Sequence, residues 1–186
     1  MAMIYNNEQT DESLKPLLLG AGKLLVLLQQ LEYVVRLCCA FLQFKGIQIT
    51  VDDLFSEEPK KRFSTLGKIL ITMKEPMGFK PSFRNRLDDF IRTRNTFIHD
   101  YWTKNEIYSI DEPIDQATFQ KIASFEETLY GETIYMTQIF IGLHYSIGAL
   151  LASREGKTNQ FEADPQYEKM KEWAPVFLSV LENEQS

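Results

Sequence analysis

The stretch at residues 24–39, which reads LLVLLQQLEYVVRLCC, decides the fold class. Its apolar residues recur at helical spacing, without the alternation of a half-buried strand, so the stretch is predicted to be helical. Apolar side chains cover most faces of this helix, which is typical of a helix surrounded by others or by a dimer partner. Among the polar exceptions, Glu32 and Arg36 are four residues apart and can pair. We expect the helix to span about residues 13–45.

The rest of the chain shows the same spacing, with proline rare inside the long segments. Ser82 is the candidate N-cap of the helix that follows the break at 75–81. Further helices are expected at about residues 63–74, 82–104 and 114–153, with an amphipathic terminal piece at 165–182 that is interrupted at Pro175. In the long helix, Gly131, Gly142 and Gly148 are candidates for bends or close contacts. The chain is therefore predicted to be a single all-α domain, residues 1–186, with a C-terminal extension at 154–186.

Composition places this domain in a reducing, aqueous compartment. A chain of 186 residues with 44% apolar content can bury a core without disulfides or a metal. Its only two cysteines, Cys38 and Cys39, are adjacent in an apolar run, so they are predicted to be small core residues and not a framework bridge. Residues 1–15 are polar and acidic, and charged and amide side chains interrupt the apolar run at 24–44. We therefore expect a cytoplasmic protein with neither an export signal nor a membrane span.

The net charge of −6 conceals a strong segregation of charge along the chain. Residues 1–59 sum to −4, residues 60–104 to +7 and residues 105–186 to −9. A phosphate-bearing ligand would be drawn to the middle segment, whereas the acidic flanks would discourage sequence-independent coating of long nucleic acid. The alternative is that basic and acidic helices neutralise one another across a bundle.

The helix expected at 82–104 places an arginine where a core residue belongs. On a helical wheel, Arg94 lies close to the centre of the apolar stripe. The stripe consists of Phe83, Leu87, Phe90, Ile91, Phe97, Ile98 and Tyr101. A guanidinium there is desolvated unless an anionic ligand, carbonyl acceptors or a carboxylate such as Glu32 meets it. A structural role and a ligand-binding role both remain open at this point.

A second, polar face of the same helix carries His99. Asn95 lies one turn before it, and Asp88 and Arg92 share the face. Because Arg94 and His99 are about 140° apart on the wheel, only a long, bent arginine side chain or a second subunit could bring both groups to one phosphate. A lone helical histidine is more often structural than catalytic, so this geometry alone does not assign a function.

Residues 94–101, which read RNTFIHDY, carry a resemblance to a known family. The pattern R-x4-H, with a polar residue after the arginine, resembles the motif of the HEPN superfamily of RNA-cleaving and nucleotide-binding helical bundles. Tyr101 extends it to R-x4-H-x-Y, which is similar to the HEPN toxins that pair with a nucleotidyltransferase antitoxin. The sequences TLGK at residues 65–68 and LDDFI at residues 87–91, which precede the motif, fit the same family. The resemblance implies an up-and-down bundle of four to five main helices, which dimerises with its motif helices near the twofold axis.

The activity that this resemblance implies is metal-independent RNA cleavage at a composite site, by a toxin or an antiviral defence effector. His99 would be the acid or base when a ribose 2′-OH attacks the adjacent phosphate, leaving a 2′,3′-cyclic phosphate. Arg94 would hold the phosphate, and Asn95 would orient His99 or the substrate. Tyr101 could be the hydroxyl that an antitoxin modifies, although its place on the apolar stripe fits a core tyrosine equally well. Asp88, Arg92 and Glu32 are candidate supporting residues.

Two other function classes stay open. One is a non-catalytic HEPN module that binds a nucleotide, RNA or a protein partner, and the other is a structural helical dimer. His144, the only other histidine, sits in an apolar helix and is expected to have a buried structural role. Without clustered Cys and His spacing, neither a metal nor a cofactor is expected.

Overall fold

The computed structural model describes residues 14–41, 50, 54–55, 64–74, 76–105, 107 and 114–182. Its helices are α1 (Lys15–Phe41), α3 (Leu66–Lys74), α4 (Pro81–Lys104), α5 (Gln116–Arg154), α6 (Thr158–Glu162), α7 (Pro165–Lys171) and α8 (Ala174–Ser179). Within these residues there is no strand, and the sole extended pairing is an isolated bridge between Phe79 and Leu181. The predicted all-α class is confirmed.

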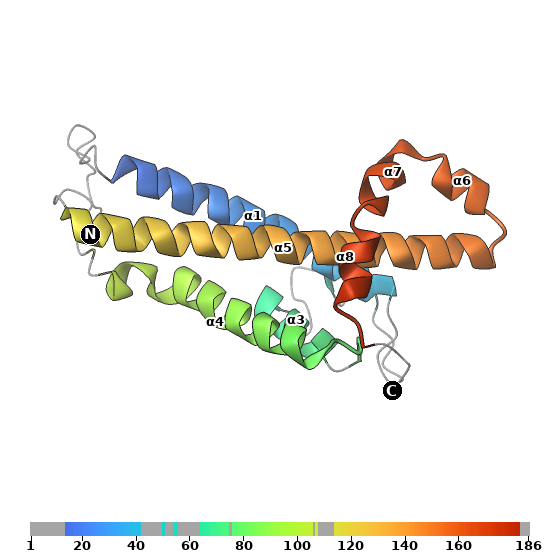
Figure 1. The fold of residues 1–186 in the computed structure, drawn as a ribbon, viewed down its shortest axis with the longest axis horizontal. Helices are drawn as coiled ribbons and strands as arrows, with labels where there is room; N and C mark the ends of the chain where they lie inside the picture. The colour runs from blue at the N-terminus through green and yellow to red at the C-terminus, as the bar shows by residue number, and fades with distance from the viewer. Residues whose placement is uncertain are drawn as a thin grey trace.

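The long helices α1 and α5 lie side by side along the molecule and point the same way (Figure 1). Near their N-terminal ends Gly20 packs against Glu126, and near the other end the Cys38 thiol donates to the Phe140 carbonyl at 3.3 Å. Because both sequences ascend together, the pair is parallel. An up-and-down order makes this pair antiparallel with four helices and parallel with five, so the expected up-and-down bundle of four to five main helices stays a prediction.

Helix α4 lies along the other side of α5 and runs antiparallel to it (Figure 1). The ion pair of Arg86 with Glu132, 2.8 Å long, and the contact of Tyr101 with Glu126 fix this register. The short helix α3 is antiparallel to α4, since Lys74 pairs with Asp88 at 2.6 Å while Gly67 faces Asn95. The motif helix is therefore held between α3 and α5.

The core lies where α1, α3, α4 and α5 meet. Its fully buried side chains include Leu31, Val35, Leu66, Ile69, Leu70, Leu87, Leu129, Met136 and Phe140. Cys38 and Cys39 are buried free thiols in the same cluster, as predicted. Burial raises the pKa of both, that of Cys39 to about 12, so these thiols stay protonated and unreactive.

The helix ends differ from the sequence expectation in one informative place. Helix α4 begins at Pro81 after Lys80, whose side chain makes no cap hydrogen bond, so Ser82 is inside the helix and its predicted capping role is wrong. Proline is suited to the first helical position because its missing N–H needs no partner there. At α5, by contrast, the Asp115 carboxylate accepts from the Thr118 N–H at 2.9 Å, which is a regular N-cap.

The C-terminal extension folds back onto α5 as three short helices. In Figure 1, α8 crosses α5, and α6 and α7 form an arch beside its C-terminal end. Two glycines permit this docking: a Cβ on Gly142 would overlap the Trp173 carbonyl, and one on Gly148 would lie 2.7 Å from the Phe161 ring. Helix α5 is continuous through Gly131, Gly142 and Gly148. The latter two thus mark close contacts and not breaks.

Helices α1 and α5 keep apolar surface outside this core. Leu19, Val26 and Tyr33 of α1 are 60%, 54% and 57% exposed and recur every seven residues, which places them on one face. Tyr130 of α5 is also exposed. Both helices are long and apolar enough to cross a membrane, a test that core helices of soluble proteins also pass. This face is available to a partner.

Candidate functional site

Arg94 is half-buried on α4, beside α1 and α3. Burial lowers the pKa of its guanidinium, and the negative charge of Glu32 partly offsets that effect. The Nη1 group donates to the Asn95 side-chain oxygen at 3.1 Å, whereas Nε is buried and has no hydrogen-bond partner among the described residues. A buried unpartnered donor is costly, about 1–3 kcal/mol. A ligand that accepts a hydrogen bond from Nε would offset this cost.

The Glu32 carboxylate does not form an ion pair with Arg94 in the described structure. It accepts from Nε and Nη2 of Arg36 at 3.2 and 2.6 Å, which confirms the expected i,i+4 pair. Arg36 also donates to the carbonyl of Leu54. Glu32 therefore acts on Arg94 only at longer range, and the purely structural explanation through a direct Arg94 to Glu32 bond is not observed.

Asn95 faces the start of α3. A Cβ built on Gly67 would lie 3.8 Å from the Asn95 side-chain oxygen and 3.5 Å from Ile91, which are ordinary contact distances, so α3 packs against α4 at this point. The amide oxygen that could orient His99 is occupied by Arg94 instead. The structure thus joins Arg94 and Asn95 directly and leaves His99 as their neighbour one turn along the helix.

Lys68 follows Gly67 and is not among the site residues predicted from the sequence. Its ammonium donates to the Ser64 hydroxyl at 2.9 Å and forms no ion pair in the described part of the chain. The cations of α3 and α4 that do form ion pairs are Lys74, Arg84, Arg86, Arg92 and Lys104. Arg94 and Lys68, by contrast, donate to neutral groups. Both cations therefore retain charge that can attract an anion. Lys68 follows Gly67, which packs against α4 at Ile91 and Asn95, and a single-helix wheel cannot show that packing.

His99 is exposed on α4, one turn beyond Asn95. It makes no hydrogen bond within the described residues, so its ring is free to meet a ligand. The two side chains expected to support it have other partners. Asp88 accepts from Lys74 at 2.6 and 2.8 Å, and Arg92 pairs with Asp89 at 2.8 Å. Their predicted support of His99 is not observed.

Tyr101 is a core residue and only 5% exposed. Its ring packs against Phe97 and Phe125, with centroids 5.1 and 6.5 Å away, and its hydroxyl donates to the Glu126 carboxylate. Burial and the neighbouring carboxylate raise the pKa of the hydroxyl far above its usual value. Of the two alternatives left by the sequence, the geometry matches the core tyrosine.

Comparisons with known proteins add no relative: no family model, no curated protein and no solved structure matches this chain. Among the described residues, no three His, Cys, Asp or Glu side chains are grouped as a metal site. The resemblance to the HEPN superfamily stays a prediction from the motif residues.

Proposed function

We propose that the cluster of Arg94, Asn95 and His99, with the positive charge of Lys68 on the neighbouring helix α3, binds an RNA phosphate and that the protein is a metal-independent endoribonuclease of HEPN type. One observation carries the proposal: the Arg94 guanidinium is half-buried and, among the described residues, bonds only to the Asn95 amide and leaves its Nε without a partner. A phosphate oxygen is the acceptor that would satisfy it, since charge-assisted bonds to phosphate suit the guanidinium fork.

His99 supplies the proton transfer in this reaction. As a base it takes the proton of a ribose 2′-OH, and the resulting oxygen forms a bond to the adjacent phosphorus. The bond from phosphorus to the 5′-oxygen breaks, and that oxygen leaves with a proton from water. The products are a 2′,3′-cyclic phosphate and a 5′-hydroxyl end. Arg94 stabilises the charge that develops on the phosphoryl oxygens during this step.

The substrate that fits is a single-stranded loop. The attacking 2′-OH must come into line with the leaving oxygen, which unpaired RNA allows more readily than a regular helix. The net charge of −6 also disfavours coating of long RNA and favours a local contact at the basic segment. We propose a cytoplasmic toxin or defence effector as the biological setting. An antitoxin that modifies Tyr101 would first have to separate α4 from α5.

The second candidate is a non-catalytic module that binds a nucleotide or RNA end at the same cluster. The specific observation in its favour is that no described side chain orients the His99 ring, while Asn95 is committed to Arg94. A catalytic histidine commonly has a partner that fixes its tautomer. Substrate or a second subunit would have to supply that partner if the protein cleaves RNA.

A cleavage assay on a hairpin RNA with a single-stranded loop separates the two candidates. It compares His99→Ala, Arg94→Lys and the control Arg92→Ala with wild type. We expect His99→Ala to lose about 10²–10⁴-fold in cleavage rate while retaining RNA binding. Arg94→Lys keeps the charge but not the fork, so it should weaken both binding and cleavage. Arg92→Ala, an exposed residue of the same helix, should behave as wild type.

The chemistry is tested in the same assay. Cleavage should continue in chelator and yield a 2′,3′-cyclic phosphate, which end-specific enzymatic repair detects. Wild-type cleavage that His99→Ala retains in full would refute the nuclease role of this site. Binding through Arg94 without any cleavage would establish the module instead.

A further inference from the structure

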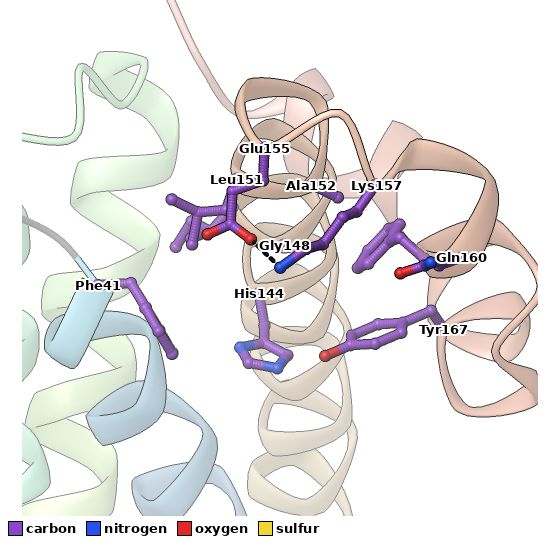
Figure 2. A pocket seen from close by; sticks show the side chains of 11 residues that line it. Phe41, His144, Gly148, Leu151, Ala152, Glu155, Lys157, Gln160 and Tyr167 are labelled. Carbon is purple, nitrogen blue, oxygen red and sulfur yellow. Dashed lines mark hydrogen bonds and ion pairs between the residues drawn. The ribbon is translucent and has the colours of Figure 1, made fainter.

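A pocket of about 370 Å³ lies between the end of α1, the C-terminal part of α5, and α6 and α7. It is at the opposite end of α5 from the contact of Tyr101 with Glu126, so it is separate from the motif cluster. In Figure 2, Phe41 forms one wall, the α5 residues His144, Gly148 and Leu151 form the floor, and Tyr167 closes the other side. Its volume is in the range of small-molecule sites.

The aromatic wall of this pocket depends on a glycine. Phe161 packs over Gly148, where any Cβ would lie 2.7 Å from the phenyl ring. The same ring is stacked with Tyr167, with centroids 4.2 Å apart and planes tilted by 32°. Phe41 faces the ring of His144 across a centroid distance of 6.2 Å. The pocket is thus bounded by flat rings, which favours a flat occupant.

The polar groups of the pocket lie at one edge. Figure 2 shows the Tyr167 hydroxyl pointing toward the ring of His144, and Gln160 lies beside Tyr167. The Nδ1 atom of His144 is buried without a hydrogen-bond partner among the described residues. Burial lowers the pKa of His144 from its usual 6.5, so the ring is neutral at pH 7. These groups offer donors and acceptors but no charge.

The charges at the rim cancel. Glu155 and Lys157 are the charged residues of the lining, and they bond to each other at 2.7 Å. The pocket therefore presents no net charge to its occupant, and breaking this pair to bind an ion would need compensation. An uncharged molecule is favoured over an anion or a cation.

From this arrangement we propose that the pocket between Phe41, His144, Phe161 and Tyr167 binds an uncharged, planar nitrogen heterocycle of the size of a nucleobase or indole. The rings of the wall pack against its faces, and its ring nitrogens and exocyclic groups bond to the imidazole, phenol and amide along the polar edge. Such a ligand bridges α1, α5 and the α6–α7 arch. It would therefore stabilise the docking of the C-terminal extension.

The test uses the full chain, with adenine and indole as probes. Because the protein has only two histidines, the imidazole carbon-bound protons of His99 and His144 give two separate signals in ¹H–¹³C spectra. We expect a saturable shift of the His144 signal with at least one probe. The His99 signal should not shift, and it serves as the internal control. Benzoate is planar but charged, and cyclohexanol is uncharged but not planar. Both should bind at least about tenfold more weakly than the better probe.

Two neighbouring leucines provide matched variants. Leu151 lines the pocket, whereas Leu150 is exposed on the same helix and does not line it. Leu151→Trp should fill the site and weaken probe binding at least about tenfold, and Leu150→Trp should leave it unchanged. The proposal fails if neither probe gives a saturable shift, if Leu151→Trp binds like wild type, or if benzoate or cyclohexanol binds as well as the probes.

Discussion

The hydroxyl of Tyr101 donates a hydrogen bond to the carboxylate of Glu126 inside the core, which ties the motif helix α4 to α5. Gly20 of α1 leaves room for that carboxylate, because a Cβ there would overlap it. Burial raises the pKa of Glu126, and the bond from Tyr101 opposes that shift. Three helices thus meet at one buried polar contact. Its integrity controls the placement of the helix that carries Arg94 and His99.

Removal of the Tyr101 hydroxyl should destabilise the protein. Tyr101→Phe leaves the buried carboxylate without this donor, at a cost of about 1–3 kcal/mol in the free energy of unfolding. Tyr130→Phe, on the exposed surface of α5, is the matched control and should cost nearly nothing. Urea unfolding monitored by circular dichroism measures both. Equal stabilities of the two variants would show that the contact contributes little.

The stability contributed by Glu126 should depend on pH. Because its folded-state pKa is raised above the usual 4.5, the folded protein holds the proton more tightly than the unfolded chain. The stabilising contribution is therefore complete below about pH 4.5 and is lost as the pH rises through the folded-state pKa. Glu126→Gln removes this loss, so the variant should gain stability relative to wild type as pH increases. Glu127→Gln, its exposed neighbour, should show no such trend in urea unfolding at a series of pH values.

Two glycines of α5 should respond oppositely to alanine. Gly142→Ala places a methyl group on the Trp173 carbonyl and should cost about 1–3 kcal/mol by displacing α8. Gly131→Ala meets open space inside a helix and should stabilise by about 0.5–1 kcal/mol. Thermal melts report both changes. A neutral Gly142→Ala would mean that α8 does not dock on α5 as described.

Arg94 should be dispensable for folding. Arg94→Met keeps an aliphatic side chain but removes the buried Nε, which has no partner in the described part of the chain, so the free energy of unfolding should stay within about 0.5 kcal/mol of wild type or rise. RNA binding should be lost in the same variant. A large loss of stability would instead identify Arg94 as a structural cation held near Glu32, and the proposed site would lose its main support.

The homodimer that the HEPN resemblance implies has two candidate faces. The sequence expectation places α4 near the twofold axis, but Ile98 is the one exposed large apolar residue in the described part of that helix. The face of α1 with Leu19, Val26 and Tyr33 is more apolar, so we expect Val26→Glu to give a monomer in sedimentation and Ile98→Glu to remain dimeric. Dissociation by Ile98→Glu alone would restore a composite site made by two α4 helices.

The sequence by itself determined the helices and the unusual position of Arg94. Apolar residues at helical spacing predict α1, α4 and α5 to within a few residues wherever the ends are described, because local periodicity reflects which side of a helix is buried. The same periodicity predicted that Arg94 would be desolvated, and it left Tyr101 open between a core residue and a modified hydroxyl. Arg94 is half-buried and Tyr101 is buried. The interruption at Pro175 likewise coincides with the start of α8.

Only the tertiary structure decided which groups meet. Three features depend on contacts between different helices: the parallel arrangement of α1 and α5, the ion pair of Asp88 with Lys74, and the packing of Gly67 against Asn95. The same holds for the pocket, whose walls come from residues as far apart as Phe41 and Tyr167. A helical wheel gives the direction of a side chain from its own axis. The partner at the end of that side chain depends on the rotation, register and direction of the neighbouring helix, and these are set by packing of the whole core.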